Sequence, residues 1–272
     1  MKTPTIAILL LAVLPLGCDQ DKYSKLLTTD AAASAASAAA VPTAPPSAAP
    51  APSASAVTAT WKKKSAADCK PHPATIDFGD DQALEKEVRR KLQKEKGPVT
   101  PAELATIRSI NLSTTTIHQI DPCIFPMFTS MRDLFLGPGD YDDLTPIMKL
   151  ADLDSLRVSL SRVKDLHALQ GLKRMDRLDL SHTLVGDDQL KSVASLTNLT
   201  ELMLDDDTIT DLTPIAHLKK LERLSIKNTA VKSLAPLSGL RSLKFLYIAG
   251  TPVSDITPVQ PLIADGMKLI QN

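Results

Sequence analysis

An apolar motif recurs through the chain with a spacing of 22 residues, as Leu199, Leu221 and Leu243 show. Each of these three copies reads Leu-x-x-Leu-x-Leu or Leu-x-x-Leu-x-Ile. A fixed period of this length indicates a stack of small similar units, in which each unit buries its apolar face against its neighbours. Such a core needs few rings, which fits an aromatic content of only 3%. The seven copies begin at Ile107, Met131, Leu153, Met175, Leu199, Leu221 and Leu243.

Each copy predicts a short strand followed by a returning segment. The motif ends in an alternation of apolar and polar residues, which puts the leucines on one face of a strand. Successive strands would lie side by side in a parallel sheet, and a second apolar set would bring the chain back along the outside. Prolines in this return favour short 3-10 turns over a long helix. These are Pro146, Pro214, Pro236 and Pro258. The fourth copy is two residues longer and predicts one short helix between Asp187 and Leu196.

The motif resembles that of the leucine-rich-repeat family, and most closely the 22-residue bacterial class found in internalins. The resemblance covers about 160 residues, from 107 to 262, in about seven repeats. It implies an α/β fold, a leucine-rich-repeat solenoid or horseshoe arc. A parallel β-sheet would line its concave side, with short 3-10 or helical segments on the convex side. An N-terminal helical cap would precede the repeats, and residues 263–272 would form a C-terminal cap.

One position departs from the pattern of the family. The family often has asparagine after the strand, where its side chain bonds the turn backbone. Most copies here have a hydroxyl residue instead, and Thr and Ser can make similar but weaker bonds. We therefore expect a polar ladder of hydroxyls in place of the asparagine ladder. The positions are Thr115, Gly139, Ser161, Thr183, Asp207, Thr229 and Thr251.

Residues 61–106 are expected to form the N-terminal cap, because the first apolar layer of a repeat stack must be covered. An apolar residue at every fourth position predicts a helix over residues 80–96, with Asp80 as its N-cap and Gly97 ending it. A capping-box pattern that begins at Thr100, with Pro next and Glu three residues on, predicts a second, short helix.

The first 17 residues are expected to be a lipoprotein signal peptide. Lys2 precedes an apolar stretch over residues 6–16, which is too short to cross a bilayer as a helix. The stretch ends in Leu-Pro-Leu-Gly-Cys, which resembles the lipobox of bacterial lipoproteins, although Pro15 stands where that family usually has Leu. The resemblance implies that Cys18 becomes the lipidated N-terminus, with enough acyl chains for stable anchoring. An ordinary secretory signal with a chance cysteine is the alternative.

Residues 18–60 predict a tether between this anchor and the cap. The part from Ala31 to Thr60 contains 15 alanines, several prolines and no charge, which predicts a disordered or partly extended spacer. Beyond Cys18, the remaining cysteines are Cys69 and Cys123. Cysteines in an exported protein tend to pair, so a Cys69–Cys123 disulfide is expected, with two separate buried thiols as the alternative.

The free face of the sheet is the candidate site for a protein partner, by analogy with the family. Phe245 and Tyr247 lie near Arg223 and Met203, and aromatic residues beside arginine are typical of an interface hot spot. Two alternatives stay open: the rings cover the end of the stack, and the charges form a solvated face paired across strands. The candidate binding residues are Phe135, Arg157, Arg177, Asp179, Glu201, Met203, Asp205, Arg223, Lys227, Phe245 and Tyr247.

Other functions find little support in the sequence. The formal charge of +0 argues against binding to nucleic acid, and the five histidines have no metal-ligand spacing. Ser181 and His182 are sequence neighbours near a strand end, which is a poor arrangement for a nucleophile and its base. We therefore expect no enzyme activity, cofactor or metal. The sequence predicts a cell-envelope lipoprotein, held on a membrane by its lipid, that presents its concave face to a protein partner. The alternative is a structural or self-associating envelope scaffold; the membrane, its face and the oligomeric state stay open.

Overall fold

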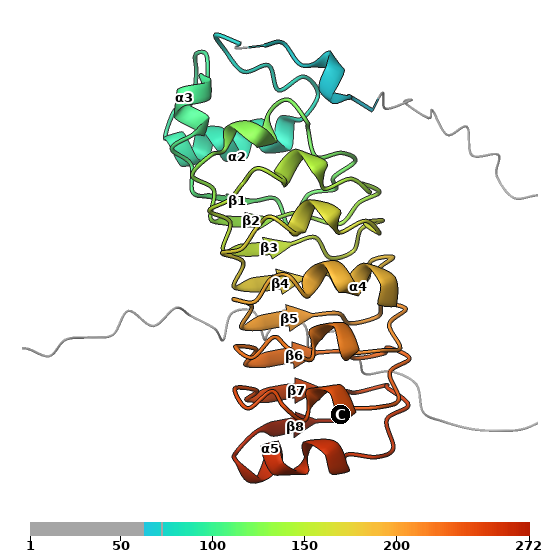
Figure 1. The fold of residues 1–272 in the computed structure, drawn as a ribbon. Helices are drawn as coiled ribbons and strands as arrows, with labels where there is room; N and C mark the ends of the chain where they lie inside the picture. The colour runs from blue at the N-terminus through green and yellow to red at the C-terminus, as the bar shows by residue number, and fades with distance from the viewer. Residues whose placement is uncertain (1–62, 72) are drawn as a thin grey trace, which may run out of the picture. The chain divides into compact units, whose positions relative to one another are not determined.

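Eight short parallel strands form one sheet in the order in which they occur along the chain (Figure 1). The structure is a computed structural model that describes residues 63–71 and 73–272. The expected signal peptide, the lipid site at Cys18 and the tether of residues 18–60 lie outside the described residues. The strands are β1 (Ser109–Asn111), β2 (Asp133–Phe135), β3 (Ser155–Arg157), β4 (Arg177–Asp179), β5 (Glu201–Met203), β6 (Arg223–Ser225), β7 (Phe245–Tyr247) and β8 (Lys268–Ile270).

The middle residue of each strand holds the strands in register. Leu156 of β3, for example, lies opposite Leu134 of β2 on one side and Leu178 of β4 on the other. All three are at most 1% exposed. A slip of one residue would turn these leucines to solvent, so the motif fixes the pairing. The parallel sheet and the α/β solenoid predicted from the repeat are confirmed.

The returning segments lie on the other side of the stack and contain 3-10 turns, as the prolines predict (Figure 1). The longer fourth copy contains the expected helix, α4 (Asp187–Val193). No helix of the described residues is long and apolar enough to cross a bilayer. The 3-10 turns are η1 (Ala66–Asp68), η2 (Phe125–Met127), η3 (Thr145–Ile147), η4 (His167–Leu169), η5 (Thr213–Ile215), η6 (Ala235–Leu237) and η7 (Thr257–Val259).

The first cap helix, α2 (Gln82–Leu92), is shorter at both ends than predicted. Its N-cap is not Asp80 but the next residue, Asp81, whose carboxylate accepts the N–H of Leu84 at 2.9 Å. The helix ends at Gln93, which adopts the left-handed conformation (φ 53°) usually taken by glycine. The expected terminator, Gly97, lies in the turn that follows.

The second cap helix, α3 (Pro101–Leu104), confirms the predicted capping box. The Thr100 hydroxyl accepts the N–H of Glu103, and the Glu103 carboxylate accepts the N–H of Thr100. Leu84 of α2 and Leu104 of α3 are fully buried in the same core as the repeats. These two helices therefore supply the apolar cover that the first repeat requires.

A disulfide joins the start of the cap to the first repeat. Cys69 and Cys123 are bonded, with an S–S distance of 2.10 Å, as the cysteine count led us to expect. Around the bond, the Lys64 ammonium pairs with Asp121 at 2.7 Å, while the backbone N–H of Lys64 donates to Gln119. No residue of η1 is buried, so the disulfide and these polar contacts hold this segment in place.

Removing the disulfide is expected to free this segment without unfolding the repeats. In a Cys69→Ser/Cys123→Ser variant, only exposed or half-exposed polar contacts would remain, and such contacts stabilise weakly. Trypsin cleavage after Lys64 should become at least about tenfold faster, while the main thermal transition moves much less. Cleavage at the wild-type rate would show that the disulfide is not what holds the segment.

The hydroxyls after the strands bond the turn backbone, as the sequence predicts. The Thr229 hydroxyl donates to the carbonyl of Ile226 at 2.7 Å, three residues earlier. The same bond is made by Thr115, Ser161 and Thr251. The exception is Thr183, whose N–H and hydroxyl both donate to Oδ1 of Asp207 in the next repeat. Side chains in this position thus close turns and, at one junction, bridge two repeats.

The C-terminal end contains a strand that the motif does not predict. After the one-turn helix α5 (Gln260–Ala264), β8 pairs with β7 and places Leu269 opposite Leu246. Residues 263–272, which we expected to act only as a cap, therefore also extend the sheet. The Leu-x-x-Leu-x-Leu motif is missing here, and only its central leucine remains.

Candidate binding face

The first and third residues of the strands form one surface, which we call the strand face. Their side chains point away from the leucine stack because side chains alternate along a strand. Figure 1 shows the strands on one side of the stack, with the 3-10 turns and α4 on the other. All the predicted binding residues lie on the strand face or, for Asp205 and Lys227, just beyond the ends of β5 and β6.

The charges of the strand face are largely paired across neighbouring strands. Arg157 Nε lies 2.9 Å from Asp179 Oδ2, across β3 and β4. Lys227 Nζ lies 3.0 Å from Asp205 Oδ2. Asp205 also accepts the Ser225 hydroxyl and the Lys227 N–H, so three donors hold it. This outcome favours the alternative in which the charges satisfy one another, and it leaves the face with little net charge.

An aromatic cluster occupies the β6–β8 end of the strand face. The Arg223 guanidinium lies 4.6 Å from the centre of the Phe245 ring and 6.0 Å from that of Tyr247. Its Nη1 donates to the Tyr247 hydroxyl at 2.8 Å, and its Nε lies 3.4 Å from Glu201 Oε1. Four of the predicted residues thus form one cluster, which we call the Arg223 cluster. Both rings are half-buried, and their remaining surface faces solvent.

The other predicted residues are spread along the face. Met203 is half-buried on β5, beside Ser225 in the sheet register. Arg177 is the most exposed of the predicted cations, with 63% of its side chain accessible. Its Nε lies 3.4 Å from Oδ2 of Asp176, the preceding residue. Phe135 is half-buried on β2, several strands away from the Arg223 cluster. The sheet register therefore aligns these residues on one face without bringing them into one site.

Sequence reasoning missed two contributors to the face, Lys268 and Ile270. Both belong to β8, and Lys268 Nζ lies 5.7 Å from the centre of the Phe245 ring. Ile270 lies beside Tyr247. The missing repeat motif hid this strand; the apolar run Met-Lys-Leu-Ile at the end of the chain was the only available signal. Phe245 and Tyr247 therefore do not lie at the end of the sheet, which argues against the view that they merely cover it.

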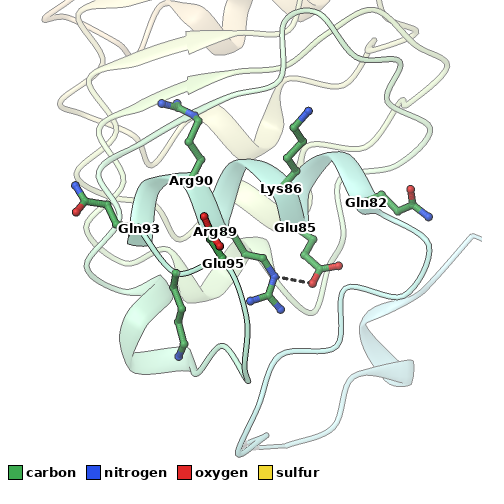
Figure 2. Close-up of a pocket in the computed structure, with 8 residues that line it drawn as sticks. Gln82, Glu85, Lys86, Arg89, Arg90, Gln93 and Glu95 are labelled. Atoms are coloured by element: carbon green, nitrogen blue, oxygen red, sulfur yellow. Dashed lines mark hydrogen bonds and ion pairs between the residues drawn. The ribbon is translucent and has the colours of Figure 1, made fainter.

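In the described part of the chain, the side chains of Ser181 and His182 bond other residues rather than one another. Within that part, no group of three or more His, Cys, Asp or Glu side chains could hold a metal ion. His182 pairs with Asp206, Nε2 to Oδ2 at 3.3 Å, while the Ser181 hydroxyl accepts the N–H of Asp205. A shallow hollow along α2 is lined by charged and amide side chains such as Lys86 and Gln93, with an Arg89–Glu85 ion pair at its centre (Figure 2).

Solved structures that resemble this fold indicate the type of repeat. Internalin C2 from Listeria monocytogenes superimposes with a TM-score of 0.65 and is 26% identical, and the match covers 75% of this chain and 100% of that one. The chain is an internalin-like leucine-rich-repeat protein. A second internalin from the same organism matches at 24% identity and a TM-score of 0.59, over 71% of this chain and 62% of that one.

A leucine-rich-repeat protein from Leptospira interrogans shares the fold at 18% identity, with a TM-score of 0.51 over 63% of this chain and 51% of that one. No protein-family model and no curated protein matches the sequence. The internalin-like protein is thus related to these structures by its repeat architecture. That architecture is a scaffold for protein–protein interaction, because stacked repeats present one long surface.

Proposed function

We propose that this internalin-like protein is a non-catalytic lipoprotein of the bacterial cell envelope, and that its strand face binds a protein partner. The observation that carries the proposal is the Arg223 cluster, in which an arginine, two aromatic rings and a glutamate share one partly exposed patch. Interface hot spots are enriched in tyrosine and arginine. Eight strands spaced by about 4.8 Å extend over roughly 34 Å, which suits a protein or an extended peptide.

The paired charges indicate which forces would dominate binding. Because Arg157 and Lys227 already have carboxylate partners on the face, a partner gains little from long-range attraction. Apolar and aromatic contacts at Phe245, Tyr247 and Met203 would then supply most of the affinity. Binding of this kind depends weakly on salt, whereas binding through unpaired surface charges is screened within about 10 Å at 0.1 M salt.

The binding proposal is tested by charge reversal at the cluster. Arg223→Glu would place a carboxylate beside Glu201 and between two rings, and should reduce recovery of a partner from an envelope extract at least about tenfold. The control is Lys232→Glu, an exposed reversal of the same size on the returning part of the same repeat. Equal recovery with both variants, or equal loss, would contradict a site on the strand face.

The anchor is tested separately. Cys18 should incorporate a labelled fatty acid in cells, and Cys18→Ser should abolish the label and release the protein from the membrane fraction. The reason is that stable attachment needs more than one acyl chain, and Cys18 is the proposed acceptor. Labelling that survives in Cys18→Ser would contradict lipidation at Cys18. It would not bear on the proposal that the strand face binds a partner.

The alternative of a self-associating envelope scaffold has its own expected result. Full-length protein would sediment as a larger species when its concentration rises, and Arg223→Glu would suppress that change if the strand face were the contact. A constant sedimentation coefficient over the same range would favour a distinct partner. The near-neutral face is the observation that keeps this alternative in view.

A further inference from the structure

Two exposed leucines lie at the turns that follow β3 and β4, outside the strand face. Leu160 is 52% exposed and Leu184 is 50% exposed, although most leucines of the repeats are buried. Residues alternate in this part of the chain, so that Ser161 and Thr183 point inward while their neighbours point outward. Arg162, next to Leu160 in this alternation, is exposed as well.

The two turns are direct neighbours. The N–H of Leu160 donates to the carbonyl of Ser181 at 3.0 Å, and the N–H of Leu184 donates to the carbonyl of Val163 at 2.9 Å. Leu160 therefore lies beside His182, and Leu184 lies beside Arg162. The backbone pairing thus places two leucines and two basic residues on adjacent turns, with Leu160 diagonal to Leu184. We call Leu160, Arg162, His182 and Leu184 the turn edge.

Leu160 also has an unfavourable backbone conformation. Its φ of 59° is left-handed, which a leucine adopts at an energetic cost. The equivalent residues of the later repeats are His182, Asp206, Asn228 and Gly250, which are the types that tolerate this conformation. An asparagine would fit the turn better than Leu160 and would expose less apolar surface. Residues held in costly conformations concentrate at functional sites.

The turn edge carries a cation that the fold does not neutralise. His182 pairs with Asp206. In contrast, Arg162 makes no ion pair with any residue of 63–71 or 73–272, although its charge helps to lower the pKa of Asp140. On the strand face, by contrast, Arg157, Arg223 and Lys227 have carboxylate partners from a neighbouring repeat. A guanidinium between two leucines matches a carboxylate flanked by aliphatic side chains, since arginine can bind a carboxylate through two parallel hydrogen bonds.

We propose that the turn edge is a second docking surface, which takes a protein segment with an Asp or Glu side chain between two aliphatic ones. The carboxylate binds Arg162, and the aliphatic groups cover Leu160 and Leu184. This surface is separate from the strand face, so one protein could hold two segments of a partner, or two partners.

The test uses the full-length protein and a displayed library of random peptides. Peptides enriched on the wild-type chain should share an acidic residue flanked by aliphatic ones. Their affinity should fall at least about tenfold in Leu160→Asn, in Leu184→Thr and in Arg162→Gln. Met148→Thr is the matched control, because Met148 is 44% exposed but lies on the outer side of the stack. This variant should bind the enriched peptides as the wild type does. Arg223→Glu should also bind these peptides normally, which separates this surface from the strand face.

Leu160→Asn gives a second readout that a structural role would not produce. Because asparagine tolerates the left-handed turn, its melting temperature should equal or exceed that of the wild type while binding is lost. Enriched peptides without the acidic and aliphatic pattern, or full binding by Leu160→Asn, would overturn the proposal. So would concentration-dependent dimers that the double variant Leu160→Asn/Leu184→Thr abolishes, because the occupant would then be a second copy of the chain.

Discussion

Replacing Gly139 with alanine is expected to destabilise the protein by about 3 kcal/mol, because the first two repeats approach each other too closely at this residue for any side chain. A Cβ added to Gly139 would lie 1.7 Å from the carbonyl oxygen of Ile117, which is part of the backbone and cannot rotate away. The two residues are bridged in parallel, so relief would require the repeats to separate. The free energy of unfolding in urea measures the effect.

Gly171→Ala is the matched control for this prediction. A Cβ at Gly171 has only the Met148 carbonyl oxygen near it, at 3.9 Å, which is an ordinary contact. This change should alter the free energy of unfolding by less than about 0.5 kcal/mol. If both alanine variants unfolded at the same urea concentration, this result would contradict the close approach of the first two repeats at Gly139.

Replacing Asp207 with asparagine is expected to stabilise the protein by about 3 kcal/mol at pH 8. Asp207 is 4% exposed, and its Oδ1 accepts the N–H and the hydroxyl of Thr183. Its Oδ2 is buried and has no hydrogen-bond partner within residues 63–71 and 73–272. Other side chains in this position donate to a carbonyl three residues earlier, which here belongs to Leu204, and a carboxylate cannot donate. An amide could donate to it and still accept from Thr183.

The stabilisation should depend on pH in a defined direction. Burial, followed by the charges of Asp179 and Asp205, raises the pKa of Asp207 to about 7, from an ordinary value of 3.8. The folded state thus holds a proton that the unfolded chain releases between these values. The contribution of Asp207 to stability is complete below pH 3.8, declines as the pH rises, and is lost above about pH 7. Asparagine does not titrate, so the gain should appear mainly at high pH.

Unfolding free energies of the wild type and of Asp207→Asn at pH 4, 6 and 8 measure this difference. The curves should lie close together at pH 4 and diverge toward pH 8. Asp206→Asn is the control, because Asp206 is exposed whereas its neighbour Asp207 is buried. The change in unfolding free energy caused by Asp206→Asn should stay small at every pH. A constant offset between the wild type and Asp207→Asn would show that Asp207 does not hold a proton in the folded state.

Much of the fold follows from the sequence because the repeat is regular. A leucine every 22 residues places Leu156 beside Leu178 without any further information, and alternation then assigns Arg157 and Asp179 to the opposite face. The capping box at Thr100 was equally direct, since it is a local pattern with a local consequence. Predictions of this kind succeed where spacing along the chain determines neighbours in space.

The errors arise where one residue acts against its type or where the pattern stops. Gln93 ends α2 in a conformation that favours glycine, so Gly97 was the wrong terminator. The strand β8 lacks the repeat motif, so Lys268 was missed. The hydroxyl prediction gave the bonds to the turn backbone, such as that of Thr229, but not the bond between two repeats in which the Asp207 carboxylate accepts from Thr183.

The binding face was predictable as a surface but not as a set of interactions. The sequence identified which side chains face outward, yet it left open whether the charges are paired. The structure shows Arg157, Lys227 and Arg223 next to carboxylates. The turn edge was not predictable in this way, because the proposal of a docking surface there depends on the left-handed backbone of Leu160 and on the exposure of Leu184.

The central claim is that the strand face holds a protein partner, and photo-crosslinking in cells tests it most directly. A photoreactive residue at Met203 lies in the middle of the strand face, while the same residue at Lys232 lies on the returning part of a repeat. Irradiation should yield a discrete protein adduct at position 203 and none at position 232. An adduct at 232 alone, equal adducts at both positions, or none at either would contradict the account.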